Sequence, residues 1–214
     1  MALPPKPPES TSIHTDHAMQ TAHDPDFTAE QYLAWEEQHA HKHEYLRGEV
    51  FAMAGGSDTH VTISLNLAAA LRAHLRGGPC RTYIADMKVE VDAANAYFYP
   101  DVFVSCDAAD AQLPDRKRAP LLVAEVLSPS TAAFDRGAKF AWYRRLPSLR
   151  EYLLIDTERL AVDLFRRDAN GHWVLYPYGE GETVELQSLV LLLLIYAIYE
   201  DASLQPPAAP TEAN

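Results

Sequence analysis

Residues 120–140 read PLLVAEVLSPSTAAFDRGAKF, and this stretch sets a carboxylate at the end of an apolar run. Its first seven residues have the composition of a buried strand, apart from Glu125. An ionised carboxylate without a partner is costly to bury, so a cation is expected beside Glu125. The residues that follow predict a helix carrying Asp135 and Lys139. The stretch therefore predicts a strand, then a helix, with a charged cluster between them.

The composition is that of an ordinary globular protein. The chain has 214 residues, of which 48% are hydrophobic and 22% charged, and this length suits one domain with a full core. No apolar run approaches the roughly 20 residues that span a bilayer, so no membrane partner is expected. The N-terminus lacks a secretion signal. A cytoplasmic location follows as an expectation, with Cys80 and Cys106 as two buried thiols.

The charge is strongly acidic, with 18 basic and 30 acidic residues and a net charge of −12. Nucleic-acid binding by overall charge is disfavoured, because phosphate contacts come from Lys and Arg. A local basic surface is still compatible with this composition. The clusters at 116–118 and 144–145 are the best candidates for one, because they flank the strand and helix of the opening stretch. An acidic composition also suits a carboxylate site for a divalent cation.

The chain divides into three parts. Residues 1–25 predict a disordered leader, residues 26–204 one domain and residues 205–214 a disordered tail, because both ends are rich in Pro and polar residues. Helices are expected after Thr28, over 59–75, from 130 to before Pro147, and as a short apolar helix near the C-terminus. Strands are expected at 43–53, 81–91, 97–105, 121–126, 151–156, 160–166 and 172–176. This order predicts an α/β or α+β fold around one central mixed sheet.

Two acids stand out by position. Asp101 opens the apolar strand VFVS, and Glu125 lies near the end of the next strand. If these strands are neighbours, both carboxylates lie on the same side of the sheet. Two close carboxylates repel each other unless a proton or a cation lies between them, and Mg²⁺ or Mn²⁺ prefers such oxygen ligands. Lys139 is then a fixed positive charge over the same end of the sheet.

Three stretches carry a family resemblance: YPDVFVSCD, VAEVLSPSTAAFDRGAKFAWYRRLPSLREYLLID and HEYLRGEVFAMAGGSDTH. They resemble the Uma-type endonuclease family of the PD-(D/E)XK restriction-endonuclease-like superfamily, over roughly residues 27–199. The resemblance implies a restriction-endonuclease-like core with a central mixed sheet flanked by helices. It also implies phosphodiester hydrolysis with DNA as the substrate.

The superfamily pattern is an Asp on one strand, an acid on the next, and a Lys two residues later. Here Asp101 matches the first element and Glu125 the second, but Leu127 stands where the lysine belongs. The resemblance implies that Lys139 on the next helix takes over the lysine role. Glu44 matches an additional N-terminal acid of such nucleases.

The implied chemistry uses Mg²⁺ (or Mn²⁺) held by Asp101, Glu125 and the backbone carbonyl of Val126. Lys139 would orient or deprotonate the attacking water, or stabilise charge on the phosphate. Glu44 would complete the coordination or hold a bound water. A homodimer is expected by analogy, because cutting both strands of a duplex calls for two sites.

Plainer interpretations remain open for each residue. Asp101 can cap a turn, Glu125 can pair with a buried arginine, and Lys139 can form a surface ion pair with Asp135. His60 is a candidate site residue, with helix capping or packing as the alternative role. Lys88 can reach the same cleft, and the alternative is that it simply lies on an exposed strand face.

Three functions therefore stay in view. The preferred one is a metal-dependent endonuclease. The second is a catalytically silent module that binds nucleic acid or protein on the same fold, which the missing lysine at Leu127 favours. The third is a metal hydrolase for a smaller phosphodiester.

Overall fold

The computed structural model describes residues 21–23, 27–53 and 55–204. The tail at 205–214 and the first 20 residues of the expected leader lie outside the described residues. Residues 21–23 differ from the expectation of disorder, because strand β1 (Thr21–His23) pairs antiparallel with β3 (Glu49–Ala52). No helix in the described ranges is long and apolar enough to cross a membrane.

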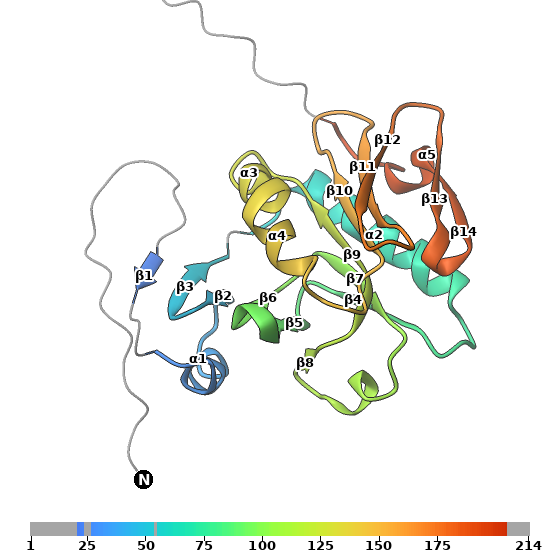
Figure 1. Ribbon diagram of the computed structural model, residues 1–214. Coiled ribbons are helices and arrows are strands. Elements are labelled where there is room, and N and C mark those ends of the chain that lie inside the picture. Colours follow the sequence, from blue (N-terminus) through green and yellow to red (C-terminus); the bar gives the residue numbers. More distant parts are fainter. Residues whose placement is uncertain (1–20, 24–26, 54, 205–214) are drawn as a thin grey trace, which may run out of the picture.

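The chain forms a mixed α+β fold with mixed sheets flanked by helices, as expected (Figure 1). The helices are α1 (Ala29–Glu36), α2 (Asp58–His74), α3 (Ala132–Phe134), α4 (Phe140–Tyr143) and α5 (Ile195–Ile198). Besides β1 and β3, the strands are β2 (His43–Leu46), β4 (Arg81–Ile84), β5 (Lys88–Val91), β6 (Ala96–Phe98), β7 (Val102–Ser105), β8 (Arg116–Lys117), β9 (Pro120–Val126), β10 (Glu151–Ile155), β11 (Val162–Arg167), β12 (Trp173–Tyr178), β13 (Thr183–Leu186) and β14 (Leu191–Leu194).

One six-stranded sheet carries the opening stretch. Its strand order is β12-β11-β10-β9-β7-β4, with β9 and β10 parallel and the other pairs antiparallel. Strand β9 is central and almost wholly buried. Alternate residues of the sheet pack into two hydrophobic clusters, one shared with α2 and the other with α4, and Figure 1 shows these helices on either side of the sheet.

The expected single sheet is instead divided: a second six-stranded sheet has the order β1-β3-β2-β6-β5-β8, and β13 and β14 form a separate two-stranded sheet. Two expected strands are each interrupted and continue in the other sheet. The strand at 81–91 breaks at Ala85, whose φ of 24° is incompatible with a continuous strand. The strand at 97–105 breaks at Tyr99–Asp101, around Pro100, which has no N–H for a sheet hydrogen bond. Asp101 therefore lies where the chain passes from one sheet to the other.

Helix α2 forms as expected, and the Ser57 side chain caps its first turn. Its buried apolar face consists of Ile63, Leu67, Ala68 and Leu71. Ile63 and Leu67 are fully buried, whereas Val61 and Leu65 are 56% and 61% exposed. Both sets recur at helical spacing, so the packing partners decide which one faces the sheet. In α1, Thr28 caps the helix and Tyr32 is buried, whereas Leu33 and Trp35 are half-buried.

The expected helix after β9 is present, in three connected parts: α3, a π-helical turn (Asp135–Lys139) and α4. A π turn accommodates one residue more than an α turn and often occurs at functional sites.

The predicted short apolar helix near the C-terminus is present as α5, and a hairpin precedes it. Residues 183–186 and 191–194 pair as the two-stranded hairpin β13–β14, and only Ile195–Ile198 is helical. Val190 takes a positive φ of 54° between the strands. In β14 the side chain of Leu193 is buried while those of Leu192 and Leu194 are exposed, which is the alternation of a strand.

The expected pair of buried thiols is also wrong. Cys80 and Cys106 form a disulfide that ties the start of β4 to the end of β7, and both residues are half-buried. They are 26 positions apart in the sequence, but β4 and β7 are antiparallel neighbours in the sheet. The strand pairing therefore brings them together, which the sequence spacing alone does not indicate.

Candidate active site

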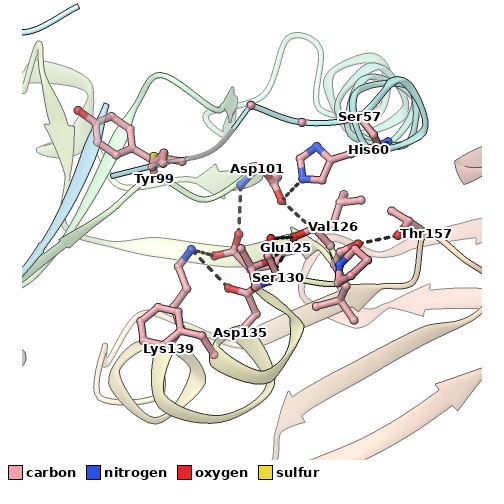
Figure 2. A pocket seen from close by; sticks show the side chains of 18 of the residues that line it. Ser57, His60, Tyr99, Asp101, Glu125, Val126, Ser130, Asp135, Lys139 and Thr157 are labelled. Atoms are coloured by element: carbon pink, nitrogen blue, oxygen red, sulfur yellow. Dashed lines mark hydrogen bonds and ion pairs between the residues drawn. The ribbon is translucent and has the colours of Figure 1, made fainter. Parts of the chain in front are cut away.

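A cavity of about 610 Å³ lies between the end of β9, the start of α2 and the π-helical turn. Figure 2 shows Lys139 and Asp135 approaching Glu125 from one side, while His60 approaches Asp101 from the other. Five of the predicted site side chains line this cavity: Glu44, His60, Asp101, Glu125 and Lys139. Val126 and Asp135 line it too.

Asp101 and Glu125 lie side by side, as the sequence predicted. Strands β7 and β9 pair antiparallel with Val102 opposite Ala124, so Asp101 stands across from Glu125. The backbone N–H of Val126 donates to Asp101 Oδ2 at 2.7 Å, and the N–H of Asp101 lies 3.4 Å from Glu125 Oε2. The backbone of each strand thus orients the acid of the other, and Asp101 is fixed by more than a turn cap.

Lys139 is buried in the cluster rather than lying on a helix surface. Its Nζ atom is 2.9 Å from Glu44 Oε1, 3.0 Å from Glu125 Oε1 and 3.6 Å from Asp135 Oδ1. Only 5% of the residue is exposed. The interpretation as an ordinary surface pair with Asp135 is therefore wrong, because Glu44 and Glu125 are the nearer partners. Lys139 is also the cation that the opening stretch required beside Glu125, in place of a buried arginine.

Glu44 reaches the cluster from β2, in the second sheet. The backbone N–H of Tyr99 donates to Glu44 Oε1 at 3.0 Å, and Lys139 contacts the same oxygen. Because Tyr99 lies in the crossing between β6 and β7, the site joins both sheets.

The electrostatics show an excess of negative charge. Burial raises the pKa of Glu125 well above its usual range, and Asp135, Asp101 and Glu44 raise it further, against the opposing effect of Lys139. The pKa values of Glu44 and Asp135 are also raised, mainly by burial. Burial alone would lower the pKa of Lys139, but Glu125 and Glu44 outweigh it and raise that pKa well above the usual value. Lys139 is therefore a cation at neutral pH.

His60 belongs to the site through Asp101. Its Nε2 lies 3.2 Å from Asp101 Oδ2, and both side chains are partly accessible. Burial lowers the pKa of His60, but the hydrogen bond and the charge of Asp101 outweigh it, so the pKa is raised. A Cβ atom at Gly56 would lie only 2.7 Å from His60 Nδ1, so glycine at this position makes room for the ring.

Lys88 is not among the residues that line the cavity. It is buried in β5, and its Nζ lies 5.4 Å from the centre of the Tyr99 ring. Sequence reasoning missed Tyr99 itself, and it missed Tyr143, whose buried hydroxyl has no hydrogen-bond partner among the described residues. Tyr143 lies close enough to Glu125 for that carboxylate to raise its pKa further, beyond the effect of burial. Aromatic residues in apolar runs look like core residues, so no sequence signal marks either one.

The residues present suit a hard divalent cation, although the described side chains do not form a complete ligand set. Among the described residues, no group of three or more His, Cys, Asp or Glu side chains is arranged to hold a metal ion. Two carboxylates, Asp101 and Glu125, converge with the backbone at Val126. Glu125 Oε1 is buried and contacts Lys139 by charge but has no hydrogen-bond partner. Such an oxygen retains the capacity to bind a cation.

Comparison with known proteins identifies a family and several similar chains. The profile of the Uma2 family, described as "Putative restriction endonuclease", matches residues 29–195. Two Synechocystis proteins are similar, both with the printed description "Uncharacterized protein": slr1290 is 39% identical over 82% of this chain and 92% of its own, and sll1609 is 35% identical over 75% and 91%.

A solved structure shares the fold. The crystal structure of a putative nuclease belonging to DUF820 from Anabaena variabilis superimposes with a TM-score of 0.66 at 15% identity, covering 80% of this chain and 97% of that one. At this identity the likeness concerns the fold alone. The family match covers most of the chain, including every carboxylate of the cavity. The chain therefore belongs to the Uma2 family.

Proposed function

We propose that the protein is a Mg²⁺- or Mn²⁺-dependent endonuclease that hydrolyses DNA phosphodiester bonds in the carboxylate–lysine cavity. The observation that carries the proposal is the convergence of Lys139, Glu125 and Asp101 in one cavity. The family description, a restriction endonuclease, supports the reaction class.

The charge balance supports a divalent cation. When ionised, the four cavity carboxylates exceed the charges of Lys139 and a protonated His60 by two. Asp101, Glu125 and the Val126 carbonyl would hold the ion. When bound, it polarises the phosphate and lowers the pKa of a water molecule.

Lys139 acts as a charged hydrogen-bond donor. Glu125 and Glu44 raise its pKa, so it holds its proton at neutral pH in the metal-free cavity. Its Nζ atom stabilises negative charge that develops on the phosphate oxygens. Glu44 from β2 and Asp135 from the π-helical turn both contact the ammonium group and hold it at the cavity.

The position of Lys139 also explains the departure from the superfamily motif. Leu127, at the motif's lysine position, is 3% exposed and packs in the hydrophobic cluster with Phe140 and Tyr143. A lysine there would bury its charge among apolar side chains. From the π-helical turn, Lys139 reaches Glu125 instead.

One observation favours the alternative of a catalytically silent binding module. Lys139 already contacts both Glu44 and Glu125, which leaves the acids internally compensated in part. In a silent module this ion-pair network is structural, and divalent cations would not bind to it.

Isothermal titration calorimetry with Mg²⁺ and Mn²⁺ and cleavage of supercoiled plasmid separate the two functions. The endonuclease binds metal, and Asp101→Asn and Glu125→Gln each lose both binding and cleavage. Glu90→Gln is the control, because Glu90 is also buried and bound to arginines but lies outside the cavity. Metal binding that survives in both site variants contradicts the proposed site. Metal-independent DNA binding without cleavage supports the silent module.

The homodimer and the cytoplasmic location remain predictions. A dimer pairs two cavities for cleavage of both strands, and light scattering of the protein with and without duplex DNA measures it.

A further inference from the structure

A second cavity, of about 390 Å³, lies near the opposite end of α2 from His60. Arg72 in the last turn of α2, Arg76 just after the helix and Arg81 at the start of β4 line it. None of the described residues that line it is acidic. The cavity is therefore a local basic site on a chain with a net charge of −12.

These three arginines differ from most others in the described part of the chain. Arg116 and Arg118, in the basic cluster that the sequence favoured for DNA, both donate to Glu90. The side chains of Arg72, Arg76 and Arg81 are exposed, and no hydrogen bond, ion pair or ring contact to a described residue holds them. Among the described residues, Arg144 and Arg150 are the other two arginines whose side chains have no such contact.

Three guanidinium groups around one cavity, with no acidic residue among its described lining, repel one another, and an anion bound in the cavity reduces that repulsion. Positive charge near the end of a helix also compensates the helix dipole, which accounts for Arg72 and Arg76. It does not account for Arg81, which approaches from a strand. An anion bound in the cavity accounts for all three arginines together. Guanidinium groups match phosphate oxygens in geometry.

The same two elements connect this cavity to the active site. Helix α2 begins next to His60, and Arg72 follows 12 residues later, about 18 Å along the helix axis at 1.5 Å per residue. Strand β4 begins at Arg81 and leads to Ala85, whose N–H donates to the carbonyl of Asp101.

We propose that the cavity formed by Arg72, Arg76 and Arg81 binds backbone phosphates of duplex DNA that lie to one side of the bond held at Asp101 and Glu125. This inference rests on the proposed nuclease function and assigns where its substrate is anchored. The contact is to phosphate, so it positions the duplex without reading its sequence.

The test measures binding of the full-length protein to a fluorescein-labelled duplex by anisotropy over a series of salt concentrations, with EDTA to prevent cleavage. Each lost phosphate contact flattens the plot of log K against log salt by about 0.9, so replacing Arg72, Arg76 and Arg81 by alanine should flatten it by about 2.7. The triple lysine variant keeps three positive charges and should keep most of the slope. Arg81→Ala alone, which leaves α2 unaltered, should flatten it by about 0.9.

The matched control is Arg144→Ala with Arg150→Ala, because these exposed arginines are also without a partner but lie outside the cavity. An unchanged slope in the triple alanine variant, or a loss confined to the control, overturns the inference. Plasmid cleavage separates this failure from a failure of the proposed function. If the wild type cleaves DNA and the arginine variants bind normally, only the anchoring site is wrong. If the wild type neither binds nor cleaves DNA, both proposals fail.

Discussion

Replacing Lys139 by methionine tests whether this lysine is the counter-charge of the buried carboxylates. Methionine keeps the length of the side chain and removes the charge, which leaves Glu44 and Glu125 buried without a cation. Removing one partner of a buried ion pair costs about 3–5 kcal/mol of unfolding free energy. For a chain of this size, that loss lowers the melting temperature by about 6–20 °C.

The loss of unfolding free energy in Lys139→Met should depend on pH and on bound metal. Without Lys139 the pKa values of Glu44 and Glu125 rise further, above the usual value of 4.5 from which they are already raised. A carboxyl group with a raised pKa in the folded state destabilises that state above its unfolded pKa, so the deficit of the variant shrinks as pH falls toward that value. Mg²⁺ should also reduce the deficit by supplying the missing positive charge.

Differential scanning calorimetry at several pH values, with and without Mg²⁺, measures this. Lys117→Met is the matched control: Lys117 is equally buried, but its Nζ donates to the backbone carbonyls of Asp110 and Leu113. Its loss should lower stability without the same dependence on Mg²⁺. A small deficit for Lys139→Met that is the same at every pH refutes the buried counter-charge. Plasmid cleavage by this variant should fall by about 10²- to 10³-fold if Lys139 acts on the phosphate.

Three further predictions use the same calorimeter. Without metal, the melting temperature of Glu125→Gln should rise relative to that of the wild type as pH rises above 4.5, because only the wild type must ionise a carboxyl group whose pKa is raised. A difference in melting temperature that stays constant with pH contradicts this. The stabilisation from His60 and Asp101 should be complete below pH 6.5 and lost as pH rises through the raised pKa of His60, so His60→Gln should be less stable than the wild type only on the acidic side. Deleting residues 1–20 should leave the melting temperature unchanged, whereas deleting 1–25 also removes β1 from the edge of β3 and should lower it.

The pairing of Asp101 with Glu125 was predictable, because apolar strands that follow one another along the chain often pair and the motif marks both acids. The burial of Lys139 was not. Spacing of four residues from Asp135 is the same for a surface pair and for a buried one, and only the π-helical turn and the approach of Glu44 from another sheet decide between them.

Other differences arise where local patterns conflict with long-range packing. Ile63 and Val61 are equally apolar, so the sequence does not reveal which of them α2 presents to the sheet. The division between the two six-stranded sheets depends on the breaks at Tyr99–Asp101 and at Ala85, and Ala85 is a residue without turn preference. The hairpin at 183–194 has a leucine-rich strand, and a short apolar run is compatible with either helix or strand.

The disulfide between Cys80 and Cys106 makes the redox history of a preparation an experimental variable. Cys80 lines the arginine cavity, and the bond holds the start of β4 to β7, the strand that follows Asp101. Purification with dithiothreitol and purification in air can therefore yield two populations, one reduced and one disulfide-bonded. Both have the same sequence and run alike on a reducing denaturing gel, but only the disulfide-bonded one has the start of β4, where Arg81 lies, tied to β7. Thiol titration of each batch before DNA-binding or cleavage assays shows which population is being measured.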